Sequence, residues 1–397
     1  MEQPTMQDDL AAEEHLHWEN TVSAISSDPF VYHVNRWTNW HNNSHQIALH
    51  QSRPLVRPQP PTEITQAFGN LMAPKIVRKL DDPDLIVRQK AMAWAVEYLS
   101  TPENRARCFA AGLLPALMRR FVDKDLCIQR RLALAFKYVA ATQSGREEMN
   151  QMGAIMELVK LLSSKDCQSR ESALEALHDA LYSEKVRLEL VNDGTILKFI
   201  LQTIDSDDEP NCIIHEFKIL FRCLKVGMDP EALSQLLGAG AISTSVRFVS
   251  HPNLGVKESA ARFICLLGMG RHGRAMAVEE KVVANLLPML NDNEPRVQAA
   301  AAAALMSITI NVDAKKELIS HDGVPAISHA FSLQDDNLCL NILQLITNMG
   351  EHPVSRTDLQ AVHYLLNGII KNSPSAIMKR CAKRAIRQLL FKHLPFT

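Results

Sequence analysis

The chain of 397 residues contains few aromatic side chains, because Phe, Trp and Tyr together make up only 6% of it. The strands of β-sandwiches favour aromatic residues, so this scarcity argues against that fold class. The sequence also lacks an apolar run of about 20 residues, the length that a helix needs to cross a bilayer. No apolar segment typical of a secretory signal follows Met1. We therefore predict neither membrane insertion nor secretion, and no membrane partner.

A surplus of charge of either sign is also lacking. Lys and Arg number 43, Asp and Glu number 44, and the formal net charge is −1. Such a protein has no overall field that attracts polyanions, so nucleic acid is not expected as a partner. The eight cysteines are scattered and form no Cys-x-x-Cys pair, which argues against a paired metal site. Reduced thiols in a cytoplasmic compartment fit this pattern.

The sequence does contain a short phrase that returns at a fixed interval. Residues 112–117 read Gly-Leu-Leu-Pro-Ala-Leu, and 153–158 read Gly-Ala-Ile-Met-Glu-Leu, 41 residues later. Residues 194–197, Gly-Thr-Ile-Leu, follow after another 41. A period of roughly 40 residues in a helical unit is typical of armadillo and HEAT repeats. We predict an all-α fold, a right-handed α-solenoid of about eight such repeats over residues 60–397.

Each unit is expected to hold two helices joined by a polar turn. In the first unit Ile76, Val77 and Leu80 share one helical face, and the turn 81–84 supplies aspartates suited to cap the next helix. The glycine that opens each phrase suits a turn with positive φ. The helix after the turn opens on a basic or polar residue.

The equivalent opening residues in successive units are expected to be Arg88, Gln129 and Arg170, spaced by 41 residues. In the fifth and sixth units we expect Lys257 and Arg296 to hold this position.

Residues 1–59 differ from the rest of the chain. They hold six of the fifteen histidines and three of the four tryptophans, and they show no sustained helical period. The extension ends in the proline-rich stretch 53–61, which favours an extended polyproline II linker. We predict an irregular N-terminal extension that is loosely structured until it docks.

Two interpretations of the aromatic residues in this extension stay open. Trp37 and Trp40, with Tyr32 upstream, are large anchors in a polar segment. One tryptophan in a partner's pocket can contribute about 2–4 kcal/mol to binding. Alternatively, these side chains fold back onto the first repeat of the same chain.

Two patterns resemble catalytic or metal motifs. Gly268–Gly273 matches G-x-G-x-x-G, but a dinucleotide fingerprint needs a strand before it, and a helical pattern precedes it here. His41 and His45 have the spacing of paired metal ligands, with His50 nearby, but no cysteine lies in the segment. A Cys–His nucleophile pair is less simple than cysteines acting as small core residues. We expect no catalytic residue, no cofactor and no metal.

The last expected helix is strongly basic. Several of its cations fall on one helical face at spacings of three and four residues; they are Lys379, Arg380, Lys383, Arg384 and Arg387, followed by Lys392. A terminal repeat must expose a polar outer surface, so a solvated cap is one interpretation. The other is a docking stripe for an acidic protein surface such as a tubulin tail or, with less support, nucleic acid.

These observations give two sets of candidate protein-binding residues. The first is Tyr32, Trp37 and Trp40, and the second is Arg380, Lys383, Arg384 and Arg387.

Several stretches resemble the armadillo-repeat proteins of ciliary and flagellar radial spokes. The similar segments are 60–69, 73–75, 88–91, 112–117 with Gly145 and Arg146, and 296–306. The resemblance runs from about residue 60 to the C-terminus. It implies a non-enzymatic scaffold in the cytoskeleton of the axoneme, with other axonemal and radial spoke proteins as partners.

Other armadillo proteins, the nuclear import adaptors and the catenins, bind extended peptides in a groove lined by repeated asparagines. Only Asn348 clearly resembles that ladder, and the companion tryptophans of the import adaptors are missing. The alternative function is therefore a soluble adaptor that binds extended peptides on its concave face.

Overall fold

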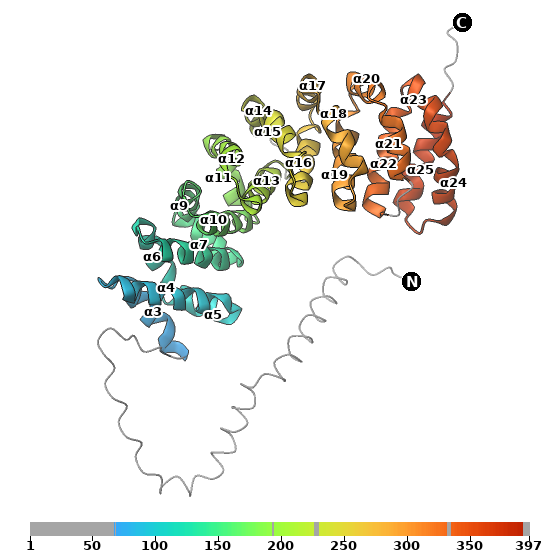
Figure 1. Cartoon of the computed structure of the whole chain (residues 1–397). Helices are drawn as coiled ribbons and strands as arrows, with labels where there is room; N and C mark the ends of the chain where they lie inside the picture. The colour runs from blue at the N-terminus through green and yellow to red at the C-terminus, as the bar shows by residue number, and fades with distance from the viewer. Residues whose placement is uncertain (1–66, 68, 193, 226–229, 332–334, 392–397) are drawn as a thin grey trace, which may run out of the picture. The chain divides into compact units, whose positions relative to one another are not determined.

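The computed structural model describes residues 67 and 69–391, except 193, 226–229 and 332–334. Every regular element within these ranges is a helix, and the helices follow one another in chain order along a single stack (Figure 1). The stack belongs to the compact unit Ile64–Thr397. The all-α solenoid is thus confirmed. The predicted extension 1–59 and its boundary with the repeats lie outside the described residues.

The unit of the stack has three helices, whereas the sequence predicts two. The first helices are short: α5 (Pro102–Ala110), α8 (Gln143–Gln151), α11 (Glu184–Asn192), α14 (Pro230–Gly238), α17 (Arg271–Glu279), α20 (Val312–Ser320) and α23 (Pro353–Asp358). Four of them, α5, α8, α17 and α23, bury only one or two residues each, so apolar spacing does not reveal them. In α8, for example, only Gly145 and Met149 are buried.

The second helices are the ones that the repeated phrase opens. They are α3 (Met72–Leu80), α6 (Leu113–Met118), α9 (Ala154–Leu161), α12 (Gly194–Ser206), α15 (Ala241–Phe248), α18 (Val282–Leu286), α21 (Gly323–Phe331) and α24 (His363–Asn372). Short 3₁₀ turns adjoin four of them: η2 (Gly69–Leu71), η3 (Arg119–Val122), η4 (Leu287–Asn291) and η5 (Leu359–Val362).

The third helices form the spine of the stack. They are α4 (Leu85–Ser100), α7 (Leu126–Ala140), α10 (Cys167–Ala180), α13 (Pro210–Lys225), α16 (Leu254–Leu267), α19 (Pro295–Ile308), α22 (Asp336–Met349) and α25 (Ala376–Leu389). Each packs against the third helix of the neighbouring unit. One continuous hydrophobic core follows this spine, and Phe136, Phe217 and Phe263 are among its largest fully buried side chains.

Polar caps fix where the third helices begin, as predicted for the first unit. The Asp84 side chain accepts a hydrogen bond from the Ile86 amide at 2.9 Å, and Asp125 accepts one from Ile128 at 3.0 Å. A side-chain oxygen at the N-cap satisfies an amide that has no partner within the helix. Asp335 and Ser375 cap α22 and α25 in the same way.

The turn before most second helices needs a residue with positive φ. Gly112, Gly153 and Gly240 occupy it with φ of 74°, 73° and 85°, as predicted. In two later units the left-handed residue is not glycine, because Lys281 and Asp322 adopt φ of 52°. In the seventh unit the prediction from Gly323 is thus wrong by one residue.

The predicted equivalence of Lys257 and Arg296 is also wrong. When the third helices are aligned on the residue that precedes each of them, Lys257 falls opposite Gln298. Gln298 donates to the Asp292 carbonyl at 2.6 Å, as Gln129 donates to the Asp123 carbonyl at 3.0 Å. The prediction chose Arg296 because this residue is basic and lies near the start of α19.

The G-x-G-x-x-G match covers the turn between two helices, as predicted, and the first residues of the second helix. Helix α16 ends at Leu267 and α17 begins at Arg271. A Cβ atom at Gly273 would lie 2.0 Å from the Leu267 carbonyl oxygen, and one at Gly145 would lie 2.1 Å from the Val139 carbonyl oxygen. These glycines therefore let a first helix cross the end of the preceding third helix.

We expect Gly273→Ala to lower the free energy of unfolding by about 1–3 kcal/mol, because the added methyl group forces α17 away from α16. Urea denaturation monitored by circular dichroism measures this change. Gly238→Ala in α14 is the matched control, since nothing lies within 4 Å of its Cβ position. It should be neutral or slightly stabilising, and an equal loss in both variants would contradict the explanation.

Candidate functional site

A groove runs across the third helices in the middle of the stack. One hollow of 950 Å³ is lined from α10, α13, α16 and α19, and an adjoining hollow of 260 Å³ is lined from α16, α19 and α22. The two hollows share Arg262, Arg296 and Ala303. We call this surface the third-helix groove.

The groove combines an apolar base with cations along its sides. Phe217 is buried beneath it, and Phe221 is half-buried in its wall. Lys218 and Arg262 are exposed, and Arg262 forms an ion pair of 2.9 Å with Glu258. Such a surface can hold an extended segment through apolar contacts and hydrogen bonds.

Arg222 is fixed at the α10 end of the groove. Its guanidinium carbon lies 3.5 Å from the centroid of the Tyr182 ring, a cation–π contact. His178 and His215 lie beside it with their rings 6.4 Å apart. Burial lowers the pKa of His215 to about 4, so this imidazole is neutral near pH 7. The charge of His215 therefore does not hold the cluster together, whereas stacking and packing do.

The side-chain amide of Asn348, the single ladder-like asparagine, already has a hydrogen-bond partner within the protein. Asn348 donates to the Met306 carbonyl oxygen at 2.8 Å, so its amide links α22 to α19. Residues that align with Asn348 in the other third helices are not asparagines. They are Glu97, Tyr138, Asp179, Arg222, Leu266, Ser307 and Gln388.

Ion pairs join consecutive units along the start of the third helices. In each of four joints a cation near the start of one third helix reaches an aspartate in the turn before the next. These joint pairs are Arg88–Asp123, Arg130–Asp166, Arg170–Asp207 and Lys257–Asp292.

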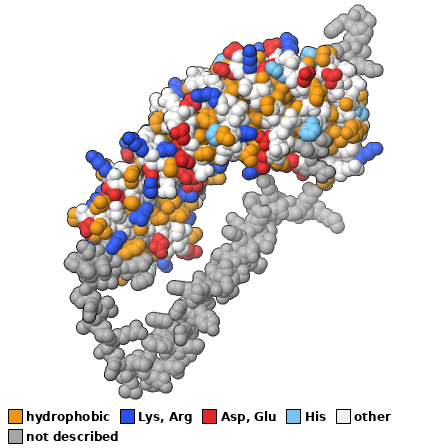
Figure 2. Space-filling view, viewed as in Figure 1, with side chains coloured by type: hydrophobic (Ala, Val, Ile, Leu, Met, Phe, Trp, Pro, Cys, Tyr) orange, Lys and Arg blue, Asp and Glu red, His pale blue; other side chains and the backbone are white. Residues whose placement is uncertain are grey.

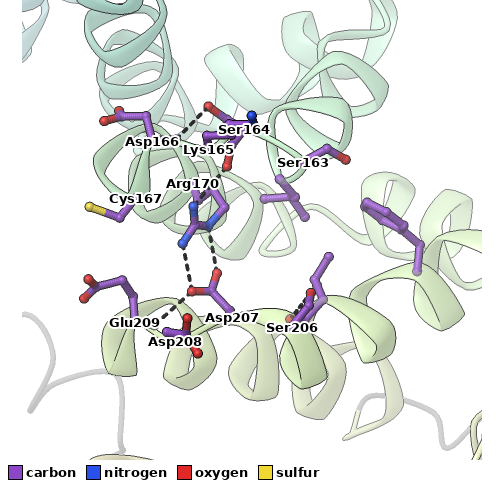
Figure 3. A pocket seen from close by; sticks show the side chains of 13 residues that line it. Ser163, Ser164, Lys165, Asp166, Cys167, Arg170, Ser206, Asp207, Asp208 and Glu209 are labelled. Atoms are coloured by element: carbon purple, nitrogen blue, oxygen red, sulfur yellow. Dashed lines mark hydrogen bonds and ion pairs between the residues drawn. The ribbon is translucent and has the colours of Figure 1, made fainter.

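The joint between α10 and α13 is the most enclosed of these. The Arg170 Nε and Nη2 atoms each donate to an Asp207 carboxylate oxygen at 2.8 Å, in a two-pronged geometry (Figure 3). The Asp207 side chain is only 4% exposed. The hydrogen bonds that Arg170 donates to Asp207 raise the pKa of Arg170. The polar hollow of 650 Å³ beside this pair is therefore a structural joint.

The preceding joint also perturbs its carboxylate. Arg130 donates to Asp166, and this hydrogen bond is the largest of the effects that lower the Asp166 pKa to about 2. Ser169 also donates to Asp166 through its backbone amide and its hydroxyl. These contacts favour the ionised carboxylate that the joint needs.

Helix α13 carries one carboxyl group inside the core. Glu216 is 1% exposed, and its Oε2 atom has no hydrogen-bond partner among the described residues. Burial raises its pKa to about 8, although a hydrogen bond with Thr203 opposes the shift. Every other third helix has an apolar buried residue at the aligned position: Ala91, Leu132, Ala173, Ala260, Ala301, Ile342 and Ala382.

The cysteines behave partly as predicted. All eight are free, and Cys108, Cys212, Cys223 and Cys339 are buried. Burial raises the pKa of the Cys108 and Cys223 thiols to about 12, which suppresses their thiolate form at neutral pH. Cys127 is exposed and so is not a core residue.

The predicted binding residues are described only in part. Tyr32, Trp37 and Trp40 lie outside the described residues, as do His41, His45 and His50. The C-terminal set lies on α25, where Arg380, Lys383, Arg384 and Arg387 are all exposed.

The exposed cations of α25 differ in their ion pairing from the cations elsewhere in the stack. No carboxylate among the described residues forms an ion pair with them. Over the face of the stack in Figure 2, by contrast, acidic and basic side chains are interspersed.

A second set of cations was missed by the sequence comparison. Arg105, Arg146 and Arg274 each donate to carbonyl oxygens at the end of the preceding third helix. Arg356 does the same with the Gly350 carbonyl at 2.8 Å. The 41-residue interval between Arg105 and Arg146 was a signal that could have revealed them.

Within the described ranges, no helix is long and apolar enough to span a membrane. Groups of three or more potential metal-ligating side chains are also absent there.

The fold is the armadillo-repeat fold. A designed armadillo repeat protein is similar over 59% of this chain and 99% of its own, with a TM-score of 0.53 and 21% identity. A crystal structure of an engineered protein matches 80% of this chain and 78% of its own, with a TM-score of 0.71 and 20% identity. No family profile matches the sequence.

The sequence relationship is more particular. Radial spoke protein 14 of Chlamydomonas reinhardtii is 28% identical over 366 residues, which cover 89% of this chain and 95% of that protein. The chain is a homologue of radial spoke protein 14. The matched share is larger than residues 60–397 supply by themselves, so the similarity extends into the first 59 residues.

Proposed function

We propose that this protein is a structural scaffold of the ciliary or flagellar axoneme and a component of the radial spoke that supports motility. The observation that carries the proposal is the near full-length similarity to radial spoke protein 14, covering 95% of that relative. A solenoid suits the role because stacked repeats give an extended surface on which several neighbours can bind. Its partners would then be other axonemal and radial spoke proteins.

The proposed role needs no catalytic residue. The ionisable groups with strongly shifted pKa values, such as Glu216 and Cys223, lie inside the helical stack. A catalytic site needs such groups to converge on a space where a substrate can sit. The groove residues instead form ion pairs and stacking contacts, which supports a binding surface.

Detergent extraction of ciliated cells that express the tagged full-length chain tests this function. We expect the protein to remain along the axoneme and to resist a moderate salt wash. The tag expressed alone is the control for trapping. A diffuse signal that extracts completely would contradict an axonemal scaffold.

A second candidate function is an adaptor that binds extended peptides, and the 950 Å³ hollow of the third-helix groove favours it. Complete extraction would support this alternative. The occupied position of Asn348 counts against a ladder of asparagine contacts, so such a peptide would have to bind through Arg262, Arg296 and the apolar base.

A further inference from the structure

The basic residues of α25 align with positions at which inner third helices contact the next unit. In α10 the carbonyl oxygen of His178 accepts from Arg222 of α13, and in α7 Lys137 pairs with Glu175 of α10 at 2.7 Å. When the third helices are aligned, His178 and Lys137 fall opposite Arg387. Arg387 therefore lies on the side of α25 that corresponds to the joint with a following unit.

Lys383 also aligns with residues that are covered in the other units. The residues aligned with it in the other third helices are all apolar and buried: Met92, Ala133, Leu174, Phe217, Ala261, Ala302 and Leu343. Lys383 is exposed. A charged side chain at this position prevents the face from being covered by another apolar helix without a large desolvation cost.

Two further cations align with the joint cations themselves. Lys379 corresponds to Arg88, Arg170 and Lys257, and Arg380 corresponds to Arg130. Each of those inner residues binds an aspartate of the next unit. No described carboxylate pairs with Lys379 or Arg380, and residues 392–397 contain no Asp or Glu. We call Lys379, Arg380, Lys383 and Arg387 the end face.

We propose that the end face is a docking surface for an acidic segment of a partner protein, whose carboxylates take the place that aspartates occupy at the inner joints. The inner joints show which chemistry this arrangement of cations binds, because all four place a cation against an aspartate. Arg384 does not belong to the end face, since it aligns with Glu175, which contacts the preceding unit. This inference does not depend on the proposed axonemal function.

Binding of a fluorescein-labelled octaglutamate peptide to the full chain tests the proposal. The end-face variant Arg380→Ala/Lys383→Ala/Arg387→Ala should weaken binding about tenfold, because three exposed ion pairs with the peptide are lost. Fluorescence anisotropy at low and physiological ionic strength measures it. Unchanged thermal unfolding would show that the variant is folded.

A matched control separates the end face from general charge. Lys124→Ala/Lys185→Ala/Lys198→Ala removes three exposed cations elsewhere and changes the net charge equally. It should alter the peptide affinity by less than twofold, and a loss equal to that of the end-face variant would overturn the proposal. Within α25, Arg384→Ala should weaken binding less than Arg387→Ala does.

Two further measurements would reveal other occupants of the end face. If a 20-nucleotide oligothymidylate binds more tightly than octaglutamate and loses affinity in the end-face variant, the surface is a nucleic-acid site and the proposal is wrong. If the chain forms oligomers by light scattering that the end-face variant abolishes, the occupant is a second copy, and the proposal is again wrong.

Discussion

Replacing Glu216 with glutamine is expected to stabilise the protein by about 3 kcal/mol at pH 7, and to remove the fall of stability that this carboxyl causes as pH rises towards 8. The reason is the position of the carboxyl group. Glu216 occupies a core position of α13 and is 1% exposed, and burial raises its pKa to about 8. Ionising it inside the stack costs free energy that the unfolded chain does not spend.

The direction of the effect follows from proton binding. Between its ordinary pKa of 4.5 and the folded value of about 8, the folded protein holds the Glu216 proton and the unfolded chain releases it. The contribution of Glu216 to the free energy of unfolding therefore falls as pH rises through this window and levels off above it. His215, with its pKa lowered to about 4, contributes with the opposite sign below pH 6.5, so the Glu216 effect is clearest between pH 6.5 and pH 8. Glutamine is neutral throughout and keeps the shape of the side chain.

Urea denaturation at pH 5, 6, 7 and 8 measures this dependence in the wild type and in Glu216→Gln. Glu209→Gln is the matched control, because Glu209 is an exposed glutamate at the start of the same helix. It should leave the slope with pH unchanged. If Glu216→Gln keeps the slope of the wild type, the buried carboxyl is not its source.

Breaking the joint between α10 and α13 should destabilise the protein, whereas Glu216→Gln should stabilise it. We expect Arg170→Met to lower the free energy of unfolding by about 3–5 kcal/mol, because Asp207 then stays buried without its partner. The Asp207 side chain is 4% exposed and that of Arg170 is 16% exposed, so water replaces the lost contact poorly. In a solenoid each unit contacts only its neighbours, so the loss falls on this joint.

An exposed pair supplies the comparison. Arg296 and Glu294 lie 3.0 Å apart with side chains 70% and 31% exposed. Arg296→Met should therefore lower the stability far less than Arg170→Met does. Arg170→Met/Asp207→Leu should recover part of the lost stability, since it removes the unpaired charge as well. Thermal and urea unfolding measure all three variants. Equal losses for Arg170→Met and Arg296→Met would refute the importance of burial.

The local features of this fold were within reach of the sequence. The interval of 41 residues predicted stacked helical repeats, and the aspartates at 81–84 predicted a helix cap that Asp84 provides. Gly112 and Gly153 predicted turns with positive φ. Each of these depends on a few consecutive residues, so the chain encodes them locally.

Some of the short first helices, α8 among them, were not predictable from apolar spacing. Helix α8 buries only two residues, Gly145 and Met149. Its contribution depends on the close crossing that Gly145 permits, with the Val139 carbonyl beside it. A residue without a side chain leaves no hydrophobic signal, so packing alone reveals the helix.

The sequence by itself determined the repeat, the all-α class and the caps, because these follow from the spacing of residues along the chain. Only the tertiary structure decided which partner each polar side chain finds. It pairs Arg170 with Asp207, ties Asn348 to the Met306 carbonyl, buries Glu216 and leaves Arg387 exposed. The physical reason is that these outcomes depend on a neighbouring unit about 40 residues away, and the periodic pattern does not say which side of a helix that unit covers.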